Sequence, residues 1–244
     1  MRKSILASLP LLTLLAYGCS EEKSESGVAT PGARETTKTR LLEAGASAMQ
    51  DKVPLQSLDA YLNGFHFYSG NMASQMEAHH FCGHLDEDVI QCVIFDGNGK
   101  NAKITGVEYV VSARLFAGLP EAEKRLWHSH VHEVRSGQLI APGIPQIAEH
   151  EFMEKLAGTY GKTWHTWHTT ENLALPIGAP MLMMGFTADG QASEEMVAER
   201  DRRFHVSSAE KRKNRADIAY PRIDPSADAW QKGDVAQLEL KFGD

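Results

Sequence analysis

The first apolar run of the chain is short and follows two basic residues. Arg2 and Lys3 precede the apolar residues 5–16, after which small residues lead to Cys19. This order is typical of a secretory signal peptide, which we assign to residues 1–18. The run is too short to span a bilayer comfortably, and no charged stop-transfer block follows it.

The next stretch almost lacks large apolar residues, and the folded body begins only after it. Ser, Glu, Thr, Gly and Lys dominate there, which predicts a disordered tether that together with Cys19 covers residues 19–52. Apolar side chains then return at helical spacing: Leu55, Leu58, Leu62 and Phe65. This spacing predicts a helix over residues 55 to about 72.

Strands and helices are predicted to alternate along the rest of the body. Five strands are predicted: His79–His84, Val89–Phe95, Ile104–Ser112, Thr163–His168 and Met181–Thr187. Val89–Phe95 is apolar on both faces, as in a central strand, and a turn is expected at Asp96–Gly99. Helices are predicted from Glu121, over Ile147–Thr159 and behind a capping box at Ser207. The order favours an α+β fold, a single domain with a mainly antiparallel sheet flanked by helices.

Composition and charge narrow the functional classes. The chain is 42% hydrophobic and 23% charged, which is ordinary for a globular protein. A formal net charge of −7 offers no electrostatic footprint for phosphates, so nucleic acid is excluded as a partner. The length suffices for one sizeable core, which we place at residues 53–220, with a C-terminal extension at 221–244.

The residues around Cys19 suggest a cellular location for the protein. Leu15-Ala16-Tyr17-Gly18-Cys19 resembles the lipobox of bacterial lipoproteins, whose cysteine carries acyl chains. With Ser20 behind the cysteine, we expect a bacterial cell-envelope lipoprotein. It would be held in the outer membrane, on the periplasmic face, by lipidated Cys19. The alternative is an ordinary secretory signal in which Cys19 is incidental.

Histidines are numerous, and several are spaced two apart. In an extended chain, alternate residues share a face, so His80, Cys82 and His84 project from one side of their run. The run from His128 repeats this arrangement, with His130 next on the same side. Two such pairs are spaced to ligate one metal ion between neighbouring strands.

We therefore treat His80, His84, His128 and His130 as candidate metal ligands. Imidazole suits Zn²⁺ or Fe²⁺ as the cofactor. Further candidates are Cys82, Glu108, Glu133 and His165. Glu108 lies in an apolar run, where an unpaired carboxylate is costly, so it needs a metal, an arginine or a histidine as a partner. The alternative is that these histidines are structural groups with ordinary hydrogen bonds.

The two cysteines of the body leave three alternatives open. Cys82 and Cys92 can form a disulfide outside the cytoplasm, Cys82 can be a metal ligand, or Cys82 can simply be a small buried hydrophobic residue. The residues favour the last of these.

Short motifs occur in order along the body: Glu77-Ala-His-His-Phe-Cys, Gln91-Cys92, Gly106-Val-Glu-Tyr109, Leu126-Trp-His-Ser-His130, Glu133-Val, Ser136-Gly137, Tyr160-Gly-Lys-Thr163, Met183-Met184 and Glu210-Lys-Arg-Lys-Asn-Arg-Ala-Asp217. Together they resemble the oil body-associated protein family, a domain of unknown function. The resemblance covers residues 55–220 without a large gap, and the motifs occur in the family's order.

The resemblance implies an association with oil bodies in plants and no established catalytic residues. Six histidines match the family pattern: His79, His80, His84, His128, His130 and His165. His132 and His168 fall where the family has other residues, so they are not candidates. An export signal and a tether depart from the cytosolic plant relatives.

Two functional hypotheses follow, and the residues leave open whether the chain is an enzyme. The first is a membrane-anchored lipoprotein that binds a lipid surface or another envelope protein and has no chemistry of its own. The second is a metal-dependent enzyme or metal-binding protein that uses the paired strand histidines.

Overall fold

A closed antiparallel sheet forms the centre of the molecule. The computed structural model describes residues 22–241 and 243. The strands are β1 (Ala60–Tyr68), β2 (Asn71–His84), β3 (Val89–Phe95), β4 (Ile104–Ser112), β5 (His128–Ser129), β6 (Thr159–His165) and β7 (Met181–Met184). Their order is β4-β3-β2-β1-β7-β6-β5, and β4 also pairs with β6. Six strands therefore close into a barrel. The short β5 pairs with the edge of β6 that faces away from β4, next to the part of that edge that pairs with β7.

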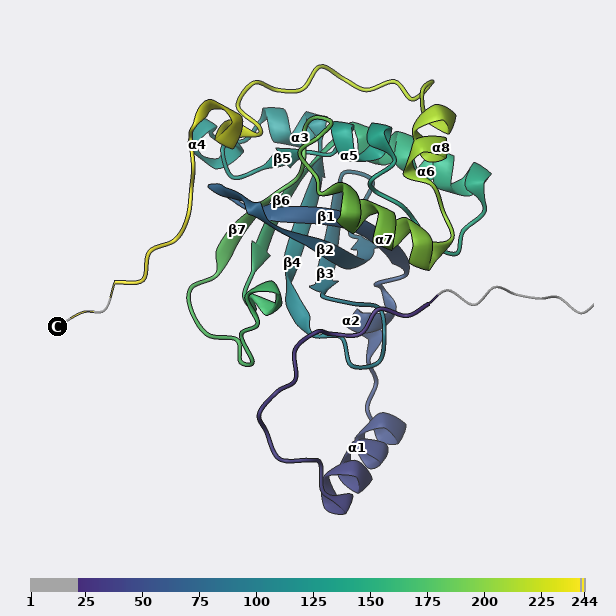
Figure 1. Cartoon of the computed structure of the whole chain (residues 1–244), viewed down its shortest axis with the longest axis vertical. Helices are drawn as coiled ribbons and strands as arrows, with labels where there is room; N and C mark the ends of the chain where they lie inside the picture. The colour runs from purple at the N-terminus through teal and green to yellow at the C-terminus, as the bar shows by residue number, and fades with distance from the viewer. Residues whose placement is uncertain (1–21, 242, 244) are drawn as a thin grey trace, which may run out of the picture.

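Helices close one end of this barrel (Figure 1). The described residues form the helices α1 (Thr37–Met49), α2 (Val53–Gln56), α3 (Ala113–Ala117), α4 (Glu121–Lys124), α5 (Val131–Ser136), α6 (Gln146–Ala157), α7 (Glu194–Phe204) and α8 (Ser208–Asn214), with 3-10 turns η1 (Thr169–Glu171) and η2 (Ala229–Lys232). Of these, α3, α5, α6 and α8 lie over this end, whereas α1 and α2 lie at the opposite end. Inward apolar residues at this end, such as Leu62 and Val110, form one core cluster with Val134 of α5 and Leu156 of α6. No helix within the described part of the chain is long and apolar enough to cross a membrane.

The predicted fold class is confirmed at the level of an α+β domain with an antiparallel sheet. The closure of the sheet into a barrel was not predicted from the sequence, because it depends on the pairing of β4 with β6. Seven residue pairs join these strands, from Gly106–His165 to Ser112–Thr159, about 50 residues apart along the chain. Each strand in a closed sheet has two neighbours, so Val89–Phe95 is flanked by β2 and β4 as a central strand must be.

The predicted helix over residues 55–72 is wrong. Only Val53–Gln56 is helical, and Ala60–Tyr68 is strand β1. Aromatic side chains favour a strand, and β1 gains nine register pairs with β2. Leu62 and Phe65 consequently pack in different core clusters, on opposite faces of the sheet. The helical spacing arose because β1 is buried on both faces and its apolar residues do not alternate.

The other elements differ from prediction mainly at their ends. β3 and β4 have the predicted bounds, whereas β2 begins at Asn71 and β6 at Thr159. The cap before α8 is confirmed, because the Ser207 hydroxyl accepts a hydrogen bond from the backbone N–H of Glu210.

The segment predicted as a disordered tether contains helix α1 in the structure. Thr36 caps it by accepting a hydrogen bond from the backbone N–H of Thr39, and no residue of the helix is buried. Just before it, the carbonyl of Ser24 accepts hydrogen bonds from Asn98 and Gly99, and Val28 is buried. Local caps and turn contacts thus give this polar segment structure without a core of its own.

Cys82 and Cys92 form a disulfide, which corrects the expectation that Cys82 is a small buried hydrophobic residue and excludes it as a thiolate ligand. The two residues face each other in the β2–β3 register. The disulfide lies at the inner face of the barrel, where both cysteines belong to the core cluster under the helices.

Reduction of this disulfide should destabilise the fold. The two cysteines are 10 residues apart in sequence, so the cross-link removes the entropy of a short loop from the unfolded chain. We expect dithiothreitol to lower the free energy of unfolding by about 3 kcal/mol, measured by urea denaturation. The Cys82→Ala/Cys92→Ala variant is the control and should not respond to dithiothreitol. Equal stability of the wild type with and without reductant would contradict the assignment.

Candidate metal centre

A layer of polar side chains crosses the middle of the barrel interior. Its members are His66 (β1), His80 (β2), Glu108 (β4), His128 (β5), Thr163 and His165 (β6), and His130 and Glu133 at the start of α5. None is more than 6% exposed. On either side of this layer the interior is apolar, with Leu62, Ile90 and Val110 toward the helices and Met76 and Met183 toward the other end. The sheet thus holds a set of ionisable groups away from water.

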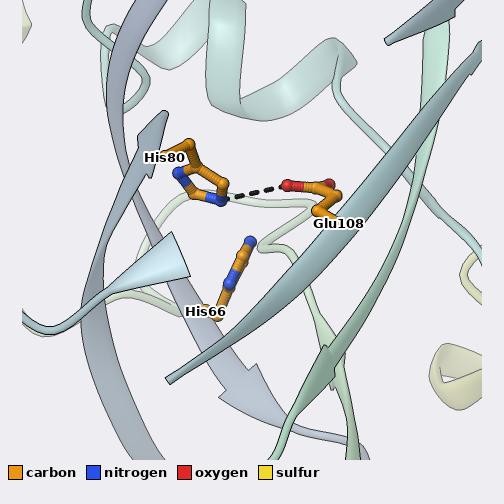
Figure 2. A group of neighbouring side chains, drawn as sticks. All are labelled: His66, His80 and Glu108. Atoms are coloured by element: carbon orange, nitrogen blue, oxygen red, sulfur yellow. Dashed lines mark ion pairs between the residues drawn. The ribbon is translucent and has the colours of Figure 1, made fainter. Parts of the chain in front are cut away.

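Glu108 is the centre of this layer. Its Oε2 lies 3.0 Å from Nε2 of His80, and its Oε1 lies 3.2 Å from Nε2 of His130 and 3.4 Å from Nε2 of His128. Figure 2 shows His80 and His66 directed toward the same carboxylate. Three imidazoles from two segments therefore share one carboxylate, with a fourth ring beside it.

The hydrogen bonds of His130 determine its tautomer. The Thr159 hydroxyl donates its hydrogen to the carbonyl of Leu156 (2.7 Å), so it must accept from Nδ1–H of His130 (2.8 Å). A neutral His130 then has its lone pair on Nε2, which faces Oε1 of Glu108. Two lone pairs at 3.2 Å repel each other unless a cation, either a proton or a metal ion, binds there.

One proton cannot satisfy the remaining rings. His80 and His128 have no aligned hydrogen bond at either nitrogen, and neither does His165, within the part of the chain that the structure describes. His80 and His128 lie within ion-pair distance of Glu108, but without hydrogen-bond geometry. Buried polar atoms normally have partners, so these ring nitrogens are available to bind a metal ion.

The charge balance of the layer leads to the same conclusion. Burial raises the pKa of Glu108, but contacts with His128, His130 and His80 outweigh this and lower it well below the usual value. Burial lowers the pKa of His66 and of His128, which keeps these rings neutral. No Lys or Arg pairs with Glu108 among residues 22–241. Neutral His66 and His128 therefore supply no positive charge to the buried carboxylate, and such a charge makes burial tolerable.

Glu133 differs from Glu108 although it lies in the same layer. Burial, and then the negative charges of Glu108 and Asp228, raise its pKa well above the usual value. Its Oε2 lies 4.0 Å from Nε2 of His128. A nearby divalent cation would reverse this effect and recruit Glu133 as a further carboxylate.

Glycines leave the space around these groups open. A Cβ on Gly161 would collide with Oε1 of Glu108 and come within 2.9 Å of Nε2 of both His128 and His130. A Cβ on Gly185 would lie 2.9 Å from Oε2 of Glu133. Beside His66, His80 and Glu108 is a cavity of about 20 Å³, the volume needed by one water molecule or ion.

The donor set and its spacing suit a transition metal. Zinc bonds of about 2.0–2.2 Å in tetrahedral geometry place neighbouring ligand atoms roughly 3.3–3.6 Å apart. The nitrogen–oxygen distances around Glu108 are 3.0–3.4 Å, close to this spacing. Imidazole and carboxylate together are ligands of Zn²⁺ and Fe²⁺, and Glu108 with His128 and His130 gives two histidines and one carboxylate.

Six of the eight candidate residues lie together in this layer: His80, His128, His130, Glu108, Glu133 and His165. His84 is a correction: it lies at the end of β2, exposed, with its ring near Phe152 rather than near the other histidines. The alternation along β2 is as expected, and His84 still pairs with Ile90 of β3, but β1 ends opposite Cys82, so His84 lies past the end of its neighbour on that side. Cys82 is in the disulfide.

His66 was missed. It lies on β1, the strand predicted as part of a helix, and its ring centroid is 4.9 Å from that of His80. The signal that could have found it is the period of two: Gly64, His66 and Tyr68 alternate with Phe65 and Phe67 in the sequence.

The fold and the site together define a closed antiparallel barrel with a buried histidine–carboxylate centre. The family described as "Protein of unknown function (DUF1264)" matches residues 52–219. The chain is 44% identical to oil body-associated protein 1B of Arabidopsis thaliana, over 88% of this chain and 90% of the relative. It is 45% identical to oil body-associated protein 1A of Zea mays (87% and 92%) and 35% identical to oil body-associated protein 2C of Arabidopsis thaliana (86% and 92%).

The chain belongs to the oil body-associated protein family, as its motifs indicated. No solved structure matches it significantly. The predicted localisation in a bacterial cell envelope is wrong, because these relatives are plant proteins named for oil bodies. The predicted signal peptide and lipidated Cys19 lie outside the described residues, and the comparisons do not support a lipid anchor there.

The buried histidines predict a specific acid sensitivity. Burial lowers the pKa of His165 to about 3, so between about pH 3 and 6.5 the unfolded chain binds a proton that the native state does not. Stability from this group is complete above about pH 6.5 and is lost as the pH falls through that window. In chelator-treated protein, His165→Gln should reduce the slope of unfolding free energy against pH by about 1.4 kcal/mol per unit. Urea denaturation between pH 4 and 6 measures this, and an unchanged slope would contradict a neutral His165.

Proposed function

We propose that the barrel is a metal-binding domain that holds a divalent transition-metal ion on Glu108, His128 and His130. The observation that carries the proposal is the position of Nε2 of His130, which lies 3.2 Å from Oε1 of the buried Glu108 carboxylate while Nδ1 is hydrogen-bonded to the Thr159 hydroxyl. An ion at Oε1 would join three donor atoms that all lie within 4.8 Å of one another. It would also supply the positive charge that the Glu108 carboxylate lacks.

The donor set favours Fe²⁺ or Zn²⁺ over Mg²⁺ and Ca²⁺, which prefer oxygen ligands. Two histidines and one carboxylate leave coordination positions open, and a bound ion of this kind can activate water or dioxygen. The chain itself would orient the ligands. Thr159 fixes the tautomer of His130, and Gly161 leaves the ion's position free of side-chain atoms.

Metal content tests this proposal directly. The full chain, produced without a polyhistidine tag and treated with Fe²⁺ or Zn²⁺, should retain tightly bound metal after desalting, measured by elemental analysis. The His128→Ala/His130→Ala variant should lose the ion at this position. The matched control is His84→Ala/His132→Ala, which removes two histidines outside the centre and should leave the metal content unchanged.

A second variant separates metal loss from ligand loss. Gly161→Ala keeps every ligand but places a methyl group against Glu108, His128 and His130. We expect at least a tenfold weaker affinity for the ion, with a native circular dichroism spectrum. A native, metal-free wild type that cannot be remetallated would overturn the proposal.

A lipid surface is a second candidate ligand, through helix α1. The relatives are named for oil bodies. In Figure 1, α1 stands away from the barrel, and its Leu41, Leu42 and Met49 are 63–82% exposed. At 3.6 residues per turn these three share one face, and Arg40 and Glu43 lie on the other. Such a helix suits the interface of a phospholipid monolayer around an oil droplet.

Substitution of this face tests the second candidate. Leu41→Ser/Leu42→Ser should abolish flotation of the full chain with phospholipid-coated triolein droplets. Substitution on the opposite face, Glu43→Ser/Ser47→Ala, should leave flotation unchanged. Equal flotation of both variants would show that α1 does not bind the droplet, and neither variant should change the metal content.

A further inference from the structure

The polar layer contains more ligands than one ion can use. Two groups of three residues each have ligand atoms within 4.8 Å of one another. One is Glu108, His128 and His130, and the other is His66, His80 and Glu108. Among the described residues, no such group joins His66 or His80 with His128 or His130.

The two groups share a single residue, and they use different atoms of it. His128 and His130 approach Oε1 of Glu108, at 3.4 and 3.2 Å. His80 approaches Oε2, at 3.0 Å. A carboxylate with His128 and His130 at one oxygen, His80 at the other and His66 close by has the arrangement of a bridging ligand between two metal ions.

We propose that the barrel binds a second metal ion on Oε2 of Glu108, with His66 and His80, so that Glu108 bridges a two-metal centre. This inference rests on the proposed metal-binding function. At bond lengths of about 2.0–2.2 Å, ligand atoms of one ion lie at most roughly 4.4 Å apart, which leaves the two histidine pairs on separate ions. Two-metal sites with ions about 3.5–4 Å apart have this kind of shared ligand.

Space and unpartnered atoms support the second position. The cavity of about 20 Å³ is lined by His66, His80, Glu108, His130 and Glu133 together with apolar residues of the core cluster, and its volume suits one ion. His66 is buried, has no partner at Nδ1, and lies edge-on to His80 at 4.9 Å between ring centroids. Figure 2 shows both rings directed at the carboxylate from neighbouring strands.

Glu133 adds a second carboxylate to the centre. It lines the same cavity as His66 and His80, and its Oε2 lies 4.0 Å from Nε2 of His128. It can therefore reach either ion. With Glu133 the centre has four histidines and two carboxylates, enough for three protein ligands on each ion and open positions for a small molecule.

Metal stoichiometry tests the inference. The full chain, stripped with a chelator and titrated with Zn²⁺, should bind two equivalents. His66→Ala/His80→Ala and His128→Ala/His130→Ala should each bind one, and Glu108→Ala should lose tight binding at both positions. His84→Ala/His132→Ala is the control and should bind two. Because a variant can fail by unfolding, each is checked by circular dichroism, and the milder His66→Gln should weaken only one equivalent.

A spectroscopic measurement on the wild type needs no variant. Mn²⁺ bound at both positions should give the electron paramagnetic resonance spectrum of a coupled pair rather than that of isolated ions. One equivalent with an uncoupled spectrum would overturn the second site and leave the proposed function intact. No bound metal would overturn both. Two equivalents that survive in both double-histidine variants would place the ions elsewhere and overturn the bridge.

Discussion

The buried carboxylate of Glu108 is the constraint on which the rest of the structure depends. It lies inside a closed sheet, 3% exposed, with three imidazoles at 3.0–3.4 Å and no Lys or Arg partner among the described residues. A charge in such a place is tolerated only when an opposite charge accompanies it. Thr159 directs Nε2 of His130 toward this carboxylate, which places a ring nitrogen where a proton or a metal ion can supply the opposite charge.

The fold supplies the ligands from segments that are distant in sequence. The pairing of β4 with β6 closes the barrel and brings Glu108 beside Gly161, whose missing side chain leaves room for an ion. The Cys82–Cys92 disulfide ties β2 to β3 next to this layer, and Cys92 is the register partner of Glu108. Helices α5 and α6 pack on one end of the barrel and keep water away from the polar layer on that side. Rigid strands and a dry interior are the conditions under which buried ligands keep a fixed geometry.

Local sequence patterns predicted most of the helices and strands. The features that they did not predict depend on pairing between strands that are distant in sequence. The bounds of β3 and β4 and the cap at Ser207 depend on nearby residues, and the structure confirms them. The alternation of residues along an extended strand also placed His80 on the same face as Cys82, and both side chains lie inside the barrel. The strand at residues 60–68 was missed because both of its faces are buried, and His66 was lost with it. Neither the closure of the sheet nor the end of β1 opposite Cys82, which leaves His84 exposed, has a local signal.

The account's central claim is that a metal ion binds at Oε1 of Glu108 between His128 and His130. X-ray diffraction recorded on both sides of the zinc or iron absorption edge, from crystals of metal-treated full chain, tests this most directly. The account predicts an anomalous peak about 2.0–2.2 Å from these three ligand atoms. A well-ordered layer of side chains with no anomalous peak would contradict it, and the histidines would then be structural groups that share protons with Glu108.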